Sequence, residues 1–236
     1  RTLTVSDNGI GMSREELIAH LGSIATSGTA KLLERLAEQG AGDNAPRLIG
    51  QFGVGFYASF MVADRVEVFS RRAGSDESWL WESDGRTGFT ICAAQAENIA
   101  RLLPSGRGTA IILHMKDESS DFLFDEKIAS VVRRYSDHIG IPIYVGDSAE
   151  PANAATALWL RPKKDISAEQ YQEFFRHITP GEDTPLLTAH WKAEGAADFS
   201  ALLFIPTLRP WDLFDPARRH AVKLYVRRVF ISDQCD

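Results

Sequence analysis

The sequence predicts an α/β fold, an α+β two-layer sandwich with helices on one face of a mixed sheet, and it predicts this arrangement twice. Segments with helical periodicity alternate with short strand-like runs bounded by turn residues in each half. A small, polar stretch that contains proline, residues 146–156, separates the halves. With 236 residues, 44% of them hydrophobic, the chain is long enough to bury two small cores.

The first half opens with a strand over residues 3–6. Ser13 and Glu16 have the spacing of a capping box and predict a helix that ends before Gly22. Apolar spacing predicts further helices over residues 30–38 and 124–139, and a short apolar helix follows the glycine-rich segment as far as Met61. Strands are predicted over residues 65–71, 79–83, 89–93, 109–115 and 141–145.

The second half is expected to begin with a short strand over residues 157–160. Ser167 opens a predicted helix that ends near Ile178, and strands are predicted over residues 186–191, 199–205 and 222–231. The expected organisation is therefore a first domain over residues 1–146, a linker over 147–156 and a second domain over 157–236.

Composition excludes several classes of function. A net charge of −6 gives no basic footprint for nucleic acid. The longest nearly apolar run, residues 54–63, is too short to span a bilayer, which needs about 20 residues. The two cysteines, Cys92 and Cys235, suggest neither a disulfide framework nor a metal cluster, and they fit a reducing compartment, so a cytoplasmic location is expected. No catalytic residue and no metal ligand is predicted within the chain.

The first motif of interest is Asp7-x-Gly9-x-Gly11, where a strand end leads into a helix. It fits an ordinary strand-to-helix turn, because Asn-Gly is a common turn pair. It also fits a nucleotide-base site, because a carboxylate can accept a hydrogen bond from an exocyclic amine. Glycines then let the backbone approach a planar ring closely.

The second motif, Gly50-x-x-Gly53-x-Gly55, precedes a predicted helix. It is either a plain glycine loop or an anion site, since backbone N–H groups at a helix start favour negative charge. The chain has no Gly-x-x-x-x-Gly-Lys-[Ser/Thr] sequence, which excludes a P-loop, and the surroundings fit a dinucleotide-binding fold poorly.

Two shorter motifs are weak alone. Ser27-Gly28-Thr29 lies between two predicted helices, where Ser27 or Thr29 can be a simple N-cap. The stretch 106–109, Gly-Arg-Gly-Thr, is either a turn or a way of aiming the hydroxyl of Thr109 into a pocket.

The order and spacing of these motifs together are specific. Asp-Asn-Gly-Ile-Gly-Met, Ser-Gly-Thr, Gly-Gln-Phe-Gly-Val-Gly-Phe-Tyr and Arg-Gly-Thr follow one another as in the ninety-kilodalton heat-shock protein chaperones. The sequence resembles their bacterial branch, high-temperature protein G. The resemblance continues over residues 157–161, 171–178, 210–212 and 223–231, so it covers nearly the whole chain.

This resemblance implies a Bergerat-type ATP-binding domain followed by part of an α/β middle domain, in an ATP-dependent chaperone that binds unfolded or partly folded clients. Asp7 would hold the adenine amine with help from Thr109, and His20 would face the ribose or phosphate side. A mobile lid would start at Ser27. The nucleotide-binding residues that the resemblance implies are Asp7, Gly9, Gly11, Met12, His20, Thr26, Ser27, Gly50, Gln51, Phe52, Gly53, Val54, Gly55, Phe56 and Thr109.

Some expected parts depart from the family pattern. Thr26 stands where the family usually has Lys, so a phosphate or ribose contact is either missing or made by Lys31. The resemblance places the water-activating Glu and the Asn that binds Mg²⁺ ahead of Arg1, and an Arg for the γ-phosphate beyond Asp236. The parent is therefore expected to be a slow ATPase that uses ATP and Mg²⁺. The alternatives are a non-hydrolysing nucleotide- or protein-binding fragment, or another ATPase of the gyrase, histidine-kinase and mismatch-repair superfamily.

The segment 210–214 contains an aromatic cluster that is either core or an exposed patch for clients. The resemblance favours partial exposure at Trp211, and the expected client-binding residues are Trp211, Leu213 and Phe214. It also implies that the parent is a homodimer through a C-terminal domain, with neither nucleic acid nor membrane as a partner.

Overall fold

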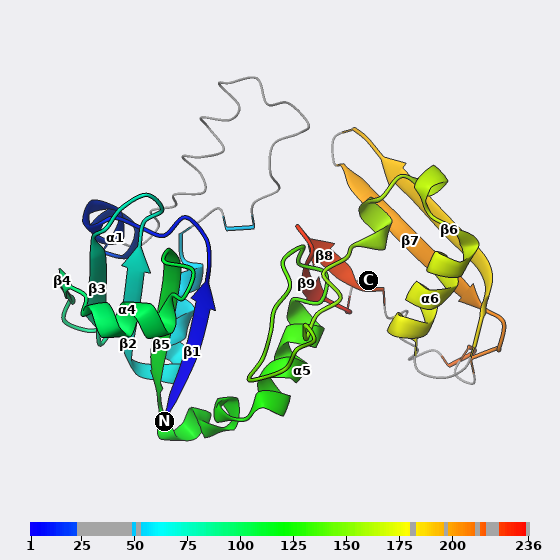
Figure 1. Ribbon diagram of the computed structural model, residues 1–236. Helices are drawn as coiled ribbons and strands as arrows, with labels where there is room; N and C mark the ends of the chain where they lie inside the picture. Colours follow the sequence, from blue (N-terminus) through cyan, green and yellow to red (C-terminus); the bar gives the residue numbers. More distant parts are fainter. Residues whose placement is uncertain are drawn as a thin grey trace. The chain divides into compact units, whose positions relative to one another are not determined.

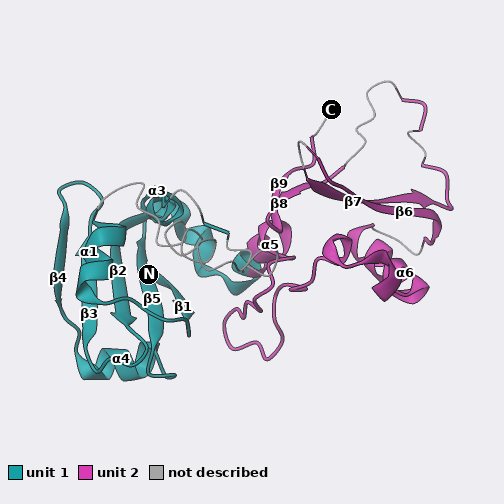
Figure 2. Cartoon of the chain, turned by 90° about the horizontal axis from the view of Figure 1, so that it is seen from above, with its two compact units in different colours: residues 1–128 teal, residues 129–236 magenta. Residues whose placement is uncertain are grey.

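The computed structural model describes residues 1–22, 49–50, 53–179, 183–195, 198–210, 213–215 and 222–234 (Figure 1). It divides into two compact units, residues 1–128 and 129–236 (Figure 2). The predicted helix over residues 30–38 lies outside the described residues, as do Thr26, Ser27, Gln51, Phe52 and Trp211.

The first unit is built on a five-stranded sheet in the order β1-β5-β2-β3-β4, in which every neighbouring pair is antiparallel. The strands coincide closely with the predicted runs. Their bounds are β1 (Thr2–Asp7), β2 (Ala63–Arg71), β3 (Ser78–Ser83), β4 (Phe89–Ala93) and β5 (Gly108–Met115).

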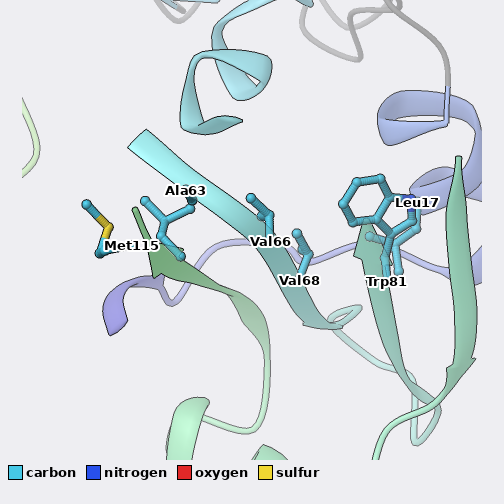
Figure 3. Packing of buried hydrophobic residues seen from close by; sticks show 7 residues of the cluster. Leu17, Ala63, Val66, Val68, Trp81 and Met115 are labelled. Carbon is cyan, nitrogen blue, oxygen red and sulfur yellow. The ribbon is translucent and has the colours of Figure 1, made fainter. Parts of the chain in front are cut away.

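One face of this sheet carries the helix α1 (Arg14–Leu21) and the pair formed by the 3-10 helix η2 (Gly55–Ala58) and α3 (Ser59–Val62). Because side chains alternate along a strand, Val66 and Val68 of β2 point to this face together. Trp81 lies against Leu17 of α1 in this core (Figure 3). The buried cluster comprises Leu17, Ala63, Val66, Val68, Trp81, Leu113 and Met115.

The opposite face carries α4 (Ala96–Leu102), a helix that the sequence analysis does not predict. Ile99 and Leu103 pack there against Phe69, Ala110 and Ile112. The expected α/β class is confirmed. Two details of the expectation are wrong, because this sheet is antiparallel throughout rather than mixed, and α4 places a helix on its second face.

Local chemistry explains where the helices begin. Ser13 caps α1 and exchanges hydrogen bonds with Glu16, so the predicted capping box is present. Ser167 and Gln170 form a second capping box at the start of α6 (Ala168–Ile178), and the bounds of this helix agree with the predicted ones. Gly22 ends α1 in the right-handed region, with its N–H bonded to the carbonyl of Ile18.

The first unit also contains the 3-10 helix η3 (Asp117–Leu123), and the division between the units falls within α5 (Asp125–Tyr135). In the second unit, β6 (Pro185–Ala193) pairs with β7 (Phe199–Pro206), and this pair packs on α6 through the rings of Phe174 and Phe175, which contact Phe204. The other elements of this unit are η4 (Leu158–Leu160), η5 (Lys163–Asp165), β8 (Leu224–Val226) and β9 (Val229–Ser232).

Three strand predictions in this region are wrong. Residues 157–160 contain a 3-10 turn rather than a strand. Residues 222–231 form a hairpin rather than one strand, because Arg227 and Arg228 adopt positive φ angles of 51° and 72° that reverse the chain. Residues 141–145 are irregular.

Asn153 explains the missing strand. Its side chain is buried, accepts the N–H of Ile143 at 2.8 Å and donates to the carbonyls of Ile139 and Ile141 at 3.2 and 3.0 Å. A side chain therefore satisfies the backbone groups that a strand partner would otherwise take.

The end of the expected linker folds back in the same way. The N–H of Ala154 binds the carboxylate of Asp137 at 2.8 Å, and the N–H of Ala155 binds the carbonyl of Asp137 at 2.9 Å. The compact units divide between Ile128 and Ala129, ahead of residues 147–156. The end of that stretch therefore belongs to the packed part of the second unit.

An aromatic cluster surrounds His138, which is 2% exposed. Its Nδ1 lies 2.7 Å from the carbonyl of Thr156, and its ring packs edge-on against Trp159 and Tyr225 at centroid distances of 4.6 and 5.2 Å. Within the described residues, no helix has the length and apolar character needed to cross a membrane.

Candidate functional site

Three strand ends meet where the sequence places its base-binding motif. Asp7, the last residue of β1, lies opposite Thr109 at the start of β5, and Thr109 lies opposite Ser70 near the end of β2. Antiparallel pairing thus brings together residues that are more than 60 positions apart in sequence, from Asp7 to Ser70.

The glycines at this corner allow a close approach of two backbones. Gly11 has a φ of +63°, and a Cβ there would lie 2.0 Å from the carbonyl oxygen of Arg71. Gly108 has a φ of +113°, and a Cβ there would lie 2.0 Å from the carbonyl oxygen of Asp7. Both positions combine a left-handed backbone with a steric conflict, so only glycine fits.

Asp7 is exposed, and its Oδ1 accepts the N–H of Gly9 at 2.8 Å. This contact fixes the carboxylate at the turn after β1. An ionised carboxylate has about four acceptor positions, so Asp7 can accept a further donor from a ligand.

A buried hydroxyl network lies beside the turn. Ser70 is fully buried, and its Oγ accepts the N–H of Met12 at 2.8 Å. The same oxygen lies 3.1 Å from both the carbonyl of Gly108 and the hydroxyl of Thr109. The sequence predicts Thr109 as a residue of the binding site, but it does not predict Ser70. The available signal was a serine on the face of a strand that also carries Val66 and Val68.

The described part of the glycine segment begins a 3-10 helix. Gly53 has a φ of +63°, and among the described residues no atom lies within 4 Å of a Cβ built at Gly55. Val54 is half exposed, and its carbonyl accepts the N–H of Tyr57 at 3.2 Å. Glycines with open space on their outer side suit an anion held by backbone N–H groups.

Phe56 anchors this segment to the core. Its ring lies edge-on to Trp81 at a centroid distance of 5.5 Å and to Phe60 at 6.2 Å. The side chain therefore belongs to the hydrophobic core, and only the backbone of Phe56 is available for the expected phosphate contact.

α1 is tied to the same segment at its last turn. The hydroxyl of Tyr57 donates to the carbonyl of Leu21 at 3.2 Å, and burial raises the pKa of Tyr57, which keeps the hydroxyl protonated as a donor. His20 is half-buried on α1, and among the described residues no group hydrogen bonds to its buried Nδ1. That nitrogen is a polar group for which a ligand or water is the natural partner.

The structure thus groups Asp7, Gly9, Gly11, Met12 and Thr109 at one corner of the sheet, while the segment 53–56 is fixed to α1 and Trp81. Of the expected client-binding residues, Leu213 is 39% and Phe214 is 77% exposed, and the guanidinium of Arg209 lies 4.7 Å from the ring centroid of Phe214. Among the described residues, no group of three or more His, Cys, Asp or Glu side chains is placed to hold a metal ion.

Comparison with known proteins gives two family matches in sequence order. Residues 1–109 match the family of histidine kinase-, DNA gyrase B- and HSP90-like ATPases, and residues 146–236 match the Hsp90 protein family.

Curated relatives match the chain along its whole length. The chaperone protein HtpG of Rhodospirillum rubrum is 49% identical over 239 residues, which cover 100% of this chain and 37% of that protein. HtpG of Methylobacterium nodulans is 50% identical, with 99% of this chain and 37% of that protein covered. HtpG of Rhodopseudomonas palustris is 50% identical, with 100% and 37% covered.

The chain therefore spans little more than a third of the length of these relatives. The strand ends and glycines of the candidate site lie within residues 1–109, which match the ATPase family, and the Hsp90 match follows them in the sequence. The chain belongs to the ninety-kilodalton heat-shock protein family, in the branch of the bacterial HtpG proteins.

Proposed function

We propose that the chain is the nucleotide-binding part, with the beginning of the middle domain, of an ATP-dependent molecular chaperone. The observation that carries this proposal is the placement of Asp7 beside Thr109, next to the buried contact of Ser70 with Met12. A carboxylate and a hydroxyl side by side at a glycine-lined corner suit the polar edge of a purine base.

The chain's own residues supply adenine binding in this proposal. Asp7 accepts a hydrogen bond from the exocyclic amine, and Gly11 and Met12 line the base. The residues fit this ligand because the carboxylate of Asp7 has acceptor capacity beyond its bond with Gly9.

Phosphate binding is proposed for the backbone of the segment 50–56. The open space at Gly55 and the left-handed Gly53 support it, as does the anchoring of Phe56, which holds the segment against the sheet. His20 is proposed to face the ribose or phosphate side. The lid that begins at Ser27 remains a proposal from the resemblance.

Mg²⁺ is expected to accompany the triphosphate and to neutralise part of its charge. Among the described residues, no group of three or more His, Cys, Asp or Glu side chains fits a metal ion. ATP hydrolysis is proposed for the whole protein, and nucleotide binding for this chain.

Client binding is proposed for Leu213 and Phe214 together with Trp211. The 77% exposure of the Phe214 ring supports contact with another chain rather than a core role. We propose in addition that the whole protein is a cytoplasmic homodimer. The stretch 147–156 is proposed as the boundary between its domains, with the packed end of that stretch, from Ala154 onward, belonging to the second domain.

Hydrogen exchange with and without saturating ADP tests the binding site. We expect slower exchange of backbone amides in residues 7–12, 53–56 and 106–110 when nucleotide is present. Protection confined to other parts of the chain, or no protection at saturating nucleotide, would contradict the proposed site.

A further inference from the structure

Ser70 is a polar residue in an apolar environment. Its side chain has no exposed surface, and it shares its face of β2 with Val66 and Val68. Burial of a hydroxyl is costly unless the group is hydrogen bonded. Its partners come from two other parts of the chain: Met12 lies after β1, and Gly108 and Thr109 begin β5.

The number of protons and lone pairs on the Ser70 hydroxyl limits the hydrogen bonds that it can form. A serine hydroxyl has one proton and two lone pairs, and the N–H of Met12 must use one lone pair because it can only donate. The single proton of Ser70 then goes either to the carbonyl of Gly108 or to the hydroxyl of Thr109, both at 3.1 Å.

The choice between these partners sets the direction of the Thr109 hydroxyl. When Ser70 donates to Thr109, the proton of Thr109 is available to a ligand. When Ser70 donates to Gly108, Thr109 can donate back to Ser70, and it then offers a ligand only an acceptor. Ser70 therefore binds the backbone at Met12 and also determines whether the hydroxyl of Thr109 donates to a ligand or only accepts.

We propose that Ser70 is a positioning residue for the base: it holds the turn at Met12 and orients Thr109 as a donor toward the ligand. The inference rests on the proposed function, in which Asp7 accepts the adenine amine. The ring nitrogen next to that amine, N1, has a lone pair and no proton at neutral pH, so it accepts a hydrogen bond. When Asp7 accepts and Thr109 donates, the two side chains match the amine of adenine and the neighbouring acceptor N1. The same pair disfavours a base that presents an acceptor in place of the amine and a donor in place of N1.

Two variants separate the hydroxyl from the shape of the side chain. Ser70→Thr keeps the hydroxyl, and Ser70→Val has nearly the same shape as Thr without it. We expect Ser70→Val to weaken ATP binding by roughly threefold to tenfold, which corresponds to one hydrogen bond, and Ser70→Thr to restore most of the affinity.

A ligand that lacks the ring acceptor gives a readout that a merely structural role would not move. We expect the unsubstituted protein and Ser70→Thr to prefer ATP over 1-deaza-ATP, in which N1 is a C–H group, and Ser70→Val to lose most of this preference. Equal weakening of both nucleotides by Ser70→Val would overturn the proposal, and so would an unsubstituted protein that binds both equally.

Hydrogen exchange at the Met12 amide tests the same contact without nucleotide. We expect faster exchange there in Ser70→Val and nearly unchanged exchange in Ser70→Thr, in proteins whose thermal unfolding remains cooperative. Unchanged exchange in Ser70→Val would overturn the anchoring role. Failure of every form to bind adenine nucleotide would instead contradict the proposed function, so the two failures are distinguishable.

Discussion

In the proposed function, adenine binding depends most directly on the carboxylate of Asp7. We predict that Asp7→Asn weakens ATP binding about tenfold to a hundredfold. The loss of a hydrogen bond to a charged acceptor costs roughly 1.5–3 kcal/mol, and the amide can turn its own donor toward the adenine amine. The turn should survive, because an Asn oxygen can still accept the N–H of Gly9.

Titration calorimetry measures this affinity. Asp84→Asn is a matched control, because Asp84 also accepts backbone N–H groups, from Arg86 and Thr87, in a turn away from the site. Equal affinity in Asp7→Asn and Asp84→Asn would remove Asp7 from the binding site.

His138 gives the second unit a pH dependence of known sign. Burial lowers the pKa of His138, and the carbonyl of Thr156 and the charge of Asp137 only partly oppose this effect. The unfolded chain therefore takes up the proton first. The contribution of the neutral His138 is fully present above about pH 6.5, the ordinary pKa of histidine, and is lost as the pH falls toward the folded pKa.

We predict that the urea midpoint for unfolding of the second unit decreases when the pH is lowered from 7.5 to 5.5. In His138→Gln, the midpoint should decrease less over the same range. Glutamine does not titrate and can still donate to the carbonyl of Thr156. An identical pH dependence in His138→Gln would show that other groups determine it.

At the scale of elements, Asn153 holds the segment between α5 and η4. We predict that Asn153→Ala destabilises the second unit by about 1–3 kcal/mol, because it leaves the N–H of Ile143 and two carbonyls without their buried partner. Limited proteolysis should then cut residues 152–156 early, whereas in the unsubstituted protein early cuts should be confined to the exposed residues before Asn153.

Ser148→Ala serves as the control, because the hydroxyl of Ser148 bonds to the backbone of Glu150 within an exposed turn. It should change neither the stability nor the pattern of cuts at residues 152–156. Early cleavage of these residues in the unsubstituted protein would mean that Asn153 does not protect them.

Elements set by local chemistry could be predicted from the sequence. The capping boxes at Ser13 and Ser167 need only a serine and its third neighbour, and turn residues separate β2, β3 and β4 along the sequence. α4 has no side-chain cap at Gln95, so the sequence contains no capping residue that would predict where this helix begins. The role of Ser70 depends on the pairing of β2 with β5, and the irregular backbone at residues 141–145 depends on Asn153, so both need contacts between distant residues.

At the scale of the whole molecule, each compact unit buries large apolar side chains of its own, such as Leu17 in the first unit and Phe175 in the second. We predict two unfolding transitions in calorimetry. Leu17→Ala should lower one of them, by about 2–5 kcal/mol in stability, and Phe175→Ala the other by about 3–5 kcal/mol, because both side chains are nearly fully buried. Added nucleotide should raise only the transition that Leu17→Ala lowers.

A single transition that both substitutions shift equally would show that the units unfold as one. A nucleotide effect on the transition of Phe175→Ala alone would place the binding site in the second unit.

The edge-on contact between His138 and Trp159 has an optical consequence. A protonated imidazole quenches the emission of a neighbouring indole far more strongly than a neutral one does, and these rings are 4.6 Å apart. Trp159 fluorescence should therefore decrease as His138 gains its proton. The emission intensity of Trp159 then reports the protonation state of His138 in the second unit. Trp79 and Trp81 emit from the first unit, and a Trp159→Phe difference spectrum separates the contributions.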